Sequence, residues 1–248
     1  MTTTDELSPR GGHDGISVAR WFALYAVMLA AAGGWLWILQ IDQTTVSFDS
    51  WAGFKSSLRE VPQAVKLLTF GIYISLCCTF LPLPANWLVA MVATRTVAVG
   101  TGLWDTVLLV GLVGAAASTV ANLNDYHLFT WMLRIRHVAK VRHARIYKIA
   151  ARWFDKSPFF LVVVFNILPI PVDVVRMLAA THRYPRAAFA GANFAGRLIR
   201  YGTIAYLIYY FELSVETAML IMLALAAAML IAKALPRLWA PQKEPEAS

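Results

Sequence analysis

The sequence has few cysteines and lacks the motifs on which most enzyme classes depend. Its two cysteines, Cys77 and Cys78, are adjacent in an apolar run, so they provide neither a disulfide framework nor spaced metal ligands. We interpret them as packing residues. There is no zinc-protease, serine-hydrolase or nucleotide-loop signature. The histidines that we place in loops or at the membrane interface do not share a metal-ligand spacing; they are His127, His137, His143 and His182. The sequence therefore predicts no enzyme activity, no metal and no cofactor.

Charged residues are also scarce. They make up 15% of the 248 residues, whereas hydrophobic residues make up 59%, and the mean hydropathy of +0.59 is far above that of typical globular domains. The chain still carries a net charge of +8, so the basic excess must be concentrated in a few segments. This composition predicts an integral membrane protein.

The N-terminal part predicts a tail followed by a membrane anchor. Residues 1–17 are polar and aperiodic, which indicates a disordered cytoplasmic tail. Residues 18–41 contain an apolar run from Trp21 to Ile41 that is long enough to span a bilayer. Arg20 and an alanine-rich stretch also resemble a cleavable signal peptide, but the apolar run continues too far for one. We favour an uncleaved transmembrane anchor.

Residues 158–181 contain the most informative pattern in the chain. Two apolar arms of about eleven residues, each covering roughly 16 Å of a ~30 Å hydrocarbon core, flank Pro169 and Pro171. The prolines remove backbone donors and bias the preceding residues, Leu168 and Ile170, away from helical conformation. We therefore predict a re-entrant helical hairpin. A proline-kinked spanning helix is the alternative.

The same pattern occurs earlier, and longer helices separate and follow the two copies. An apolar run from Val65 to Pro82 is followed by Pro84, a short arm over 86–94 and a basic residue. Residues 42–62 form a mixed polar loop, and residues 236–248 a cytoplasmic tail. Further spanning helices are expected over Leu103–Asn124, Ala187–Phe211 and 218–235.

Basic residues fix the expected topology. Residues 133–156 carry eight basic residues against one acid, and the positive-inside rule places them in the cytoplasm. Both termini are then cytoplasmic, and 42–62 and 212–216 lie outside. The predicted fold is an all-α polytopic membrane protein with an inverted repeat of a re-entrant hairpin plus a transmembrane helix, flanked by N- and C-terminal transmembrane helices.

The basic segment 133–156 also has an imperfect apolar face. A cationic amphipathic helix of this kind would lie in the interface and attract anionic lipid headgroups. Ordinary positive-inside charge explains most of the basic residues, and nucleic-acid binding is disfavoured because no soluble domain is linked to the segment.

Each helix that follows a hairpin carries three polar residues with i, i+4, i+7 spacing, which places them on one helix face. Arg197 lies about 15 Å into its helix and hence near the midplane, with Asp173 or Asp125 as the expected counter-ion. A substrate contact and an internal salt bridge remain alternatives for Arg197. The small pair Ala192 and Gly196 would allow another helix to approach closely. The two stripes are Ser118, Asn122 and Asp125, and Asn193, Arg197 and Arg200.

Over roughly residues 65–210 the chain resembles the DedA family, also called VTT-domain or SNARE-associated Golgi proteins. No single motif carries the resemblance; the order and spacing of several do. The matching segments are FLPLPAN (Phe80–Asn86), the small-residue helix Gly111–Tyr126, FNILP (Phe165–Pro169), and the series Ala179, Ala180, Arg183, Pro185 and Phe189.

The resemblance implies a protein of the bacterial plasma membrane. Its function would be lipid flipping or scrambling, transport of a phosphorylated lipid carrier, or membrane homeostasis. Four positions depart from the family pattern, and one of them is Val172, where the family has a further arginine; here Arg176 follows four residues later. Asn86 replaces the embedded Glu, Asn166 the arginine of the R-F-x-P core, and Asn122 the Asp. Because asparagine does not titrate, proton coupling through these positions is in doubt.

We therefore expect the VTT-like domain, residues 65–211, to translocate lipids or lipid-linked phosphates. The partners would be membrane lipids with anionic headgroups, and self-association into a homo-oligomer is a further hypothesis. The alternative is a non-transporting membrane scaffold with internally paired polar residues. The hairpin breaks are Pro82, Pro84, Pro169 and Pro171, and the candidate headgroup residues are Asn86, Asn122, Asp125, Asn166, Asp173, Arg176, Asn193, Arg197 and Arg200.

Overall fold

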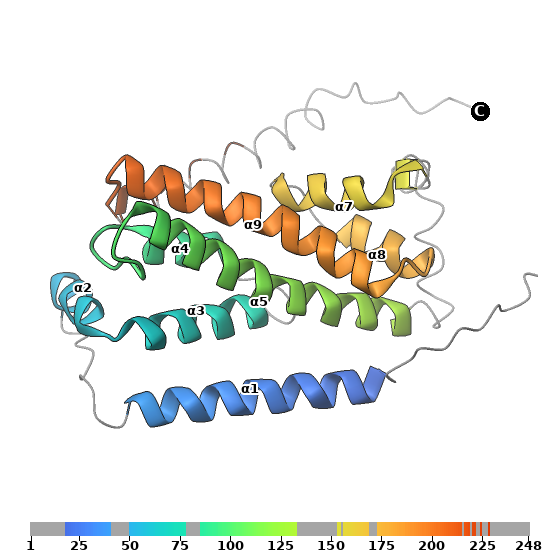
Figure 1. The fold of residues 1–248 in the computed structure, drawn as a ribbon, viewed down its shortest axis with the longest axis horizontal. Coiled ribbons are helices and arrows are strands. Elements are labelled where there is room, and N and C mark those ends of the chain that lie inside the picture. The colour runs from blue at the N-terminus through green and yellow to red at the C-terminus, as the bar shows by residue number, and fades with distance from the viewer. Residues whose placement is uncertain are drawn as a thin grey trace, which may run out of the picture.

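The computed structural model describes residues 18–40, 50–77, 85–132, 153–154, 156–168, 173–214 and scattered positions from 216 to 228. Every regular element in these ranges is an α-helix (Figure 1). The helices are α1 (Val18–Gln40), α2 (Trp51–Glu60), α3 (Gln63–Cys77), α4 (Ala85–Ala93), α5 (Leu103–Met132), α7 (Pro158–Ile167), α8 (Asp173–Thr181) and α9 (Arg186–Tyr210).

Proline sets several helix boundaries. Pro158 occupies the first turn of α7, where its missing N–H costs nothing. The helix ends at Ile167, and Leu168 is extended (φ −74°, ψ 147°) because Pro169 follows it. The predicted departure of Leu168 from helical conformation is therefore confirmed, while Ile170 lies outside the described residues. α9 begins directly after Pro185.

Two helices end in a left-handed residue that is not glycine. Arg183 follows α8 with φ 48°, and Glu212 follows α9 with φ 52°. In each case the next amide reaches back over the last turn, Tyr184 N to Ala179 O at 2.9 Å and Leu213 N to Ile208 O at 3.0 Å. This pattern satisfies carbonyls that the helix itself leaves open, and it turns the chain sharply into and out of α9.

The helices form two similar units, each consisting of two shorter helices separated by a proline-containing break and then a long helix. The first unit is α3, α4 and α5, and the second is α7, α8 and α9. In each unit the first short helix packs against its own long helix, whereas the second packs against the long helix of the other unit, α4 on α9 and α8 on α5. The pairs of short helices lie toward opposite ends of the molecule, and α5 and α9 cross between them (Figure 1).

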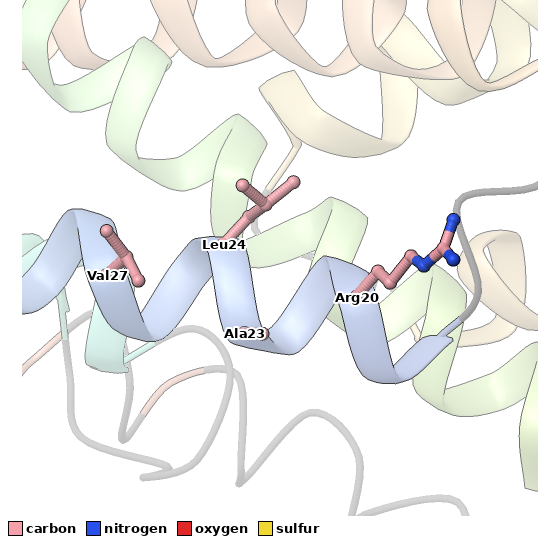
Figure 2. A pocket seen from close by; sticks show the side chains of 4 residues that line it. All are labelled: Arg20, Ala23, Leu24 and Val27. Atoms are coloured by element: carbon pink, nitrogen blue, oxygen red, sulfur yellow. The ribbon is translucent and has the colours of Figure 1, made fainter.

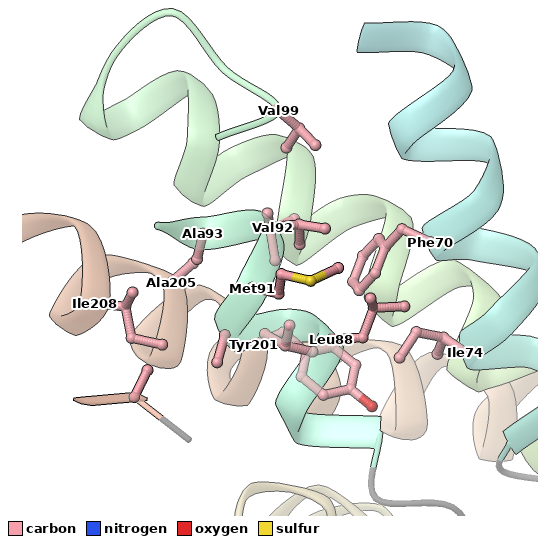
Figure 3. Packing of buried hydrophobic residues seen from close by; sticks show 14 residues of the cluster. Phe70, Ile74, Leu88, Met91, Val92, Ala93, Val99, Tyr201, Ala205 and Ile208 are labelled. Atoms are coloured by element: carbon pink, nitrogen blue, oxygen red, sulfur yellow. The ribbon is translucent and has the colours of Figure 1, made fainter. Parts of the chain in front are cut away.

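The core consists of two apolar clusters, one around the short helices of each unit. Phe70 and Ile74 of α3 and Leu88 of α4 pack around Tyr201 of α9 (Figure 3). The second cluster joins α7 and α8 to the start of α9 and the end of α5, and it includes Val162, Leu178, Phe189, Ala192 and Tyr126. Because each cluster contains side chains from both units, the two units are held together by the same burial that folds them.

α1 lies at the periphery. It is apolar on all sides, and among its residues 18–38, whose burial is described, only Tyr25 is buried. The Tyr25 hydroxyl donates to the Ser75 carbonyl at 3.2 Å, and the Trp21 Nε1 donates to Asn124 Oδ1 at 2.7 Å. α1 (as Val18–Ile38) and α5 (as Leu103–Trp131) are long and apolar enough to cross a membrane. α9 is similarly long but carries three arginines.

Two sequence predictions need correction. α5 does not end at Asn124 but continues to Met132, because Asp125 is neutralised by an arginine and His127 is buried against Trp21, with 4.8 Å between ring centroids. His127 therefore lies in a helix and not in a loop. The predicted loop 42–62 contains α2, which Ser50 caps by accepting from the Gly53 amide at 3.0 Å.

Several predicted features lie outside the described residues. They include the two tails, most of the basic segment 133–156, most of the helix expected over 218–235, Cys78, and all four break prolines.

A buried polar network as the candidate functional site

A network of polar side chains is buried where α5 crosses α9. Ser118, Asn122 and Asp125 on α5 are all buried, as are Asn193 and Arg197 on α9. The predicted i, i+4, i+7 spacing therefore puts each stripe on a largely buried face of its helix. Polar groups at this depth must be hydrogen-bonded or paired, since an unsatisfied one costs free energy.

Arg176 of α8 enters this network from the second unit. Its Nη1 lies 2.6 Å from Asp125 Oδ2, and its Nη2 donates to Asn122 Oδ1 at 2.5 Å. Both ionic side chains are less than one tenth exposed. Of the two expected counter-ions of Arg197, Asp125 has its recorded ion pair with Arg176, and the side chain of Asp173 lies outside the described residues. The cause is the position of α8, which packs against α5, the long helix of the other unit.

An amide pair links the two long helices directly. Asn122 Nδ2 donates to Asn193 Oδ1 at 2.7 Å, and Asn193 Nδ2 donates to the Phe189 carbonyl of its own helix at 2.7 Å. Both asparagines are completely buried. Asn122 thus accepts from Arg176 and donates to Asn193, so one side chain connects α5, α8 and α9.

Arg197, one turn after Asn193 on α9, is held by α7 of its own unit. Its Nε donates to Asn166 Oδ1 at 3.0 Å, and its Nη1 donates to the Tyr201 hydroxyl at 3.2 Å. The guanidinium also lies 5.7 Å from the centre of the Tyr201 ring, within the range of a cation–π contact. Asn166 is oriented by its own bond to the Val162 carbonyl at 2.8 Å. Tyr201, four residues after Arg197, was not among our predicted site residues, although its i+4 position was a usable signal.

Gly196 lets α7 come this close. A Cβ at this position would lie 2.7 Å from the Asn166 Cβ and 2.7 Å from the Val163 carbonyl oxygen. Real Cβ atoms do not approach backbone atoms so closely, so glycine is required for the α7–α9 contact. The predicted close approach at the Ala192–Gly196 pair therefore occurs, and it brings Asn166 within reach of Arg197.

Arg200 lies at the half-buried edge of the network, next to one residue from each pair of short helices. Its Nη1 lies 3.3 Å from the carbonyl oxygen of Leu168, directly after α7. Its Nη2 lies 3.4 Å from Oδ1 of Asn86, in the first turn of α4. One guanidinium thus contacts the residue before the second break and a residue just after the first.

The side chain of Asp173 and the four break prolines are outside the described residues. Of the nine predicted headgroup residues, the other eight fall into three sets according to their recorded bonds. Arg176, Asp125, Asn122 and Asn193 form one connected set, and Arg197 with Asn166 and Arg200 with Asn86 form two separate pairs.

A hollow of about 350 Å³ lies on α1, away from this network (Figure 2). Its described lining is Arg20, Ala23, Leu24 and Val27, which share one face of the helix. Leu24 and Val27 are more than half exposed. An exposed apolar face on a peripheral helix is what a hydrocarbon environment favours, so this hollow does not compete with the polar network as a functional site.

These features define an all-helical membrane protein whose polar residues are gathered between two similar helical units. A comparison with models of protein families identifies the family. The model of the VTT domain matches residues 89–210, which run from α4 to the end of α9. The chain belongs to this family, the DedA or SNARE-associated Golgi proteins. No curated protein and no solved structure matches the chain.

Proposed function

We propose that this protein moves phosphate-bearing lipids between the leaflets of a bacterial plasma membrane, with both termini in the cytoplasm. The headgroup would pass through the contact between the two helical units while the acyl or prenyl tails stay in the bilayer. Membership of a family of transporter-type membrane proteins supports a transport role. The observation that carries the proposal is the set of buried polar residues between α5, α7, α8 and α9, in a core that is mostly apolar.

The membrane arrangement that we propose is an inverted repeat of two re-entrant hairpins. The arms α4, α7 and α8 have nine or ten residues, about 15 Å each, so none of them can cross a ~30 Å hydrocarbon core. Non-helical backbone at the breaks is tolerated in a membrane when protein or a polar cavity surrounds it. Packing of each second arm against the long helix of the other unit supports this arrangement.

The chemistry of the network suits a phosphate. Arginine carries a permanent charge and a planar fork of donors that binds phosphate oxygens in a bidentate manner. Arg176, Arg197 and Arg200 approach the unit interface from two helices, and Asp125 is the acid recorded beside them. The amides of Asn86, Asn122 and Asn166 do not titrate. We therefore propose transport without proton coupling through these three positions.

A second function, a non-transporting membrane scaffold, is favoured by one observation. Arg176 and Asp125 form an ion pair at 2.6 Å, and Arg176 also donates a hydrogen bond to Asn122. These contacts are what a purely structural pair would show. In a scaffold the network would fix the orientation of the two units and would have no contact with a substrate.

Translocation of a fluorescent phosphate-bearing lipid in proteoliposomes separates the two functions. We expect Arg197→Ala to lower the rate at least tenfold, and Arg197→Lys to lower it too, since lysine cannot replace both recorded bonds. Arg95→Gln, which removes an exposed arginine bonded to Glu212 at 2.8 Å, should leave the rate unchanged. Equal rates in protein-free liposomes and with wild-type protein would refute transport and favour the scaffold.

A further inference from the structure

Tyr201 lies on α9 of the second unit, but its ring is part of the apolar cluster of the first unit. It is completely buried and lies with Phe70, Ile74 and Leu88 in that cluster (Figure 3). Its hydroxyl oxygen accepts a hydrogen bond from Nη1 of Arg197 at 3.2 Å, one turn earlier on the same helix. Tyr201 therefore connects the apolar core of the first unit to a cation of the polar network.

Gly114 of α5 fixes the position of this ring. A Cβ at Gly114 would lie 2.8 Å from Cδ2 of Tyr201 and 3.2 Å from Cζ of Phe70. The two aromatic rings therefore occupy the space that a side chain on α5 would need. Because a close-packed core leaves its side chains little freedom to shift, the first unit holds the Tyr201 hydroxyl at a defined point.

The Tyr201 hydroxyl gives the Arg197 guanidinium a second fixed point. The bond from Arg197 Nε to Asn166 Oδ1, at 3.0 Å, holds one corner of the planar group but does not stop the rest from swinging about that corner. The bond from Nη1 to Tyr201 holds a second corner, and the Tyr201 ring adds a cation–π contact at 5.7 Å. Two held corners define the plane of the donor fork, and a defined plane is what bidentate binding of an anion requires.

We propose that Tyr201 is a positioning residue for lipid translocation: it orients Arg197 for the headgroup and, being completely buried, does not itself contact the lipid. This inference rests on the proposed function. It adds the residue that orients Arg197 and the source of that order, which is the packing of the first unit. In the competing account Tyr201 only fills the core, and its hydroxyl has no part in transport. Tyr201→Phe separates the two accounts, because it retains the ring with its packing and removes only the oxygen atom.

The orientation of Arg197 can be measured without a transport assay. Nitrogen NMR of protein labelled in its arginine side chains reports how fast each guanidinium rotates, and Arg197→Gln identifies the Arg197 signal by its loss. In lipid nanodiscs we expect Tyr201→Phe to speed the rotation of Arg197 about tenfold, because a hydrogen bond to a charged group is lost. Tyr206→Phe is the matched control. It removes one hydroxyl from the same helix, where the Tyr206 ring lies 5.9 Å from that of Trp104, and it should leave the rotation of Arg197 unchanged.

Translocation of the fluorescent phosphate-bearing lipid then tests whether this orientation is used. Tyr201→Phe should lower the rate about tenfold, with a thermal unfolding midpoint close to that of the wild type, and Tyr206→Phe should leave the rate unchanged. In an Arg197→Gln background, Tyr201→Phe should cause no further loss of the residual rate, because no guanidinium remains to be oriented.

Two results would overturn the positioning role: rotation of Arg197 in Tyr201→Phe as slow as in the wild type, or translocation by Tyr201→Phe at the wild-type rate. An equal loss of rate in the Arg197→Gln background would also overturn it, because Tyr201 would then act without Arg197. Absence of translocation by the wild-type protein would refute the proposed function, and the NMR result would then decide alone whether Tyr201 orients Arg197. The two ideas can therefore fail separately.

Discussion

Removing either member of the Arg176–Asp125 pair should destabilise the protein more than removing both. At an effective dielectric constant of about 20, charges 2.6 Å apart attract by about 6 kcal/mol. Withdrawing each ion from water costs several kcal/mol, so the intact pair is close to neutral in net stability. A single substitution leaves one charge buried without its partner, at a cost of about 3–5 kcal/mol.

The test compares Asp125→Ala, Arg176→Met and the double variant by thermal unfolding in one detergent. For a protein of this length, a loss of 3–5 kcal/mol corresponds to a fall in Tm on the order of 10 °C. The double variant should recover much of that fall. Arg95→Gln provides the exposed control: the side chains of its pair, with Glu212, are 49% and 64% exposed, and such pairs contribute about 0–1 kcal/mol.

A double variant that is as unstable as the sum of the two single variants would refute this reasoning. The destabilisation would then come from lost packing or from the orphaned Asn122 and not from an uncompensated charge. Single variants as stable as the wild type would also contradict the prediction, because they would mean that water reaches Arg176 or Asp125 in the folded protein.

Two further predictions use other parts of the chain. Gly196→Ala should lower the free energy of unfolding by about 1–3 kcal/mol, because its methyl group would lie 2.7 Å from the Val163 carbonyl oxygen. Gly191→Ala on the same helix is the control: its methyl group would meet nothing nearer than 4.0 Å, so the change should be neutral or slightly stabilising. Thermal unfolding compares the two variants. For topology, an impermeant thiol reagent outside intact cells should label cysteines introduced over 212–216 but not over 140–150, and the reverse pattern would refute the proposed orientation.

Much of the architecture follows from the sequence because it depends on local physics. A proline stops a helix wherever it stands, so the end of α7 and the extended Leu168 were predictable from Pro169 alone. The i, i+4, i+7 spacing of Ser118, Asn122 and Asp125 fixes their common face in any α-helix. The abundance of apolar residues likewise predicts a membrane protein without any knowledge of which helices touch.

The partners of the buried charges were decided by the tertiary structure. Sequence spacing places Arg197 and Asp125 at comparable depth and made them plausible partners, yet α8 returns beside α5 and delivers Arg176 to Asp125 instead. The extension of α5 past Asn124 has the same origin, since Asp125 is tolerated in the helix core through Arg176. Arg200 likewise joins Leu168 and Asn86, residues that are 82 positions apart in the chain and become neighbours only because both short-helix pairs fold toward α9.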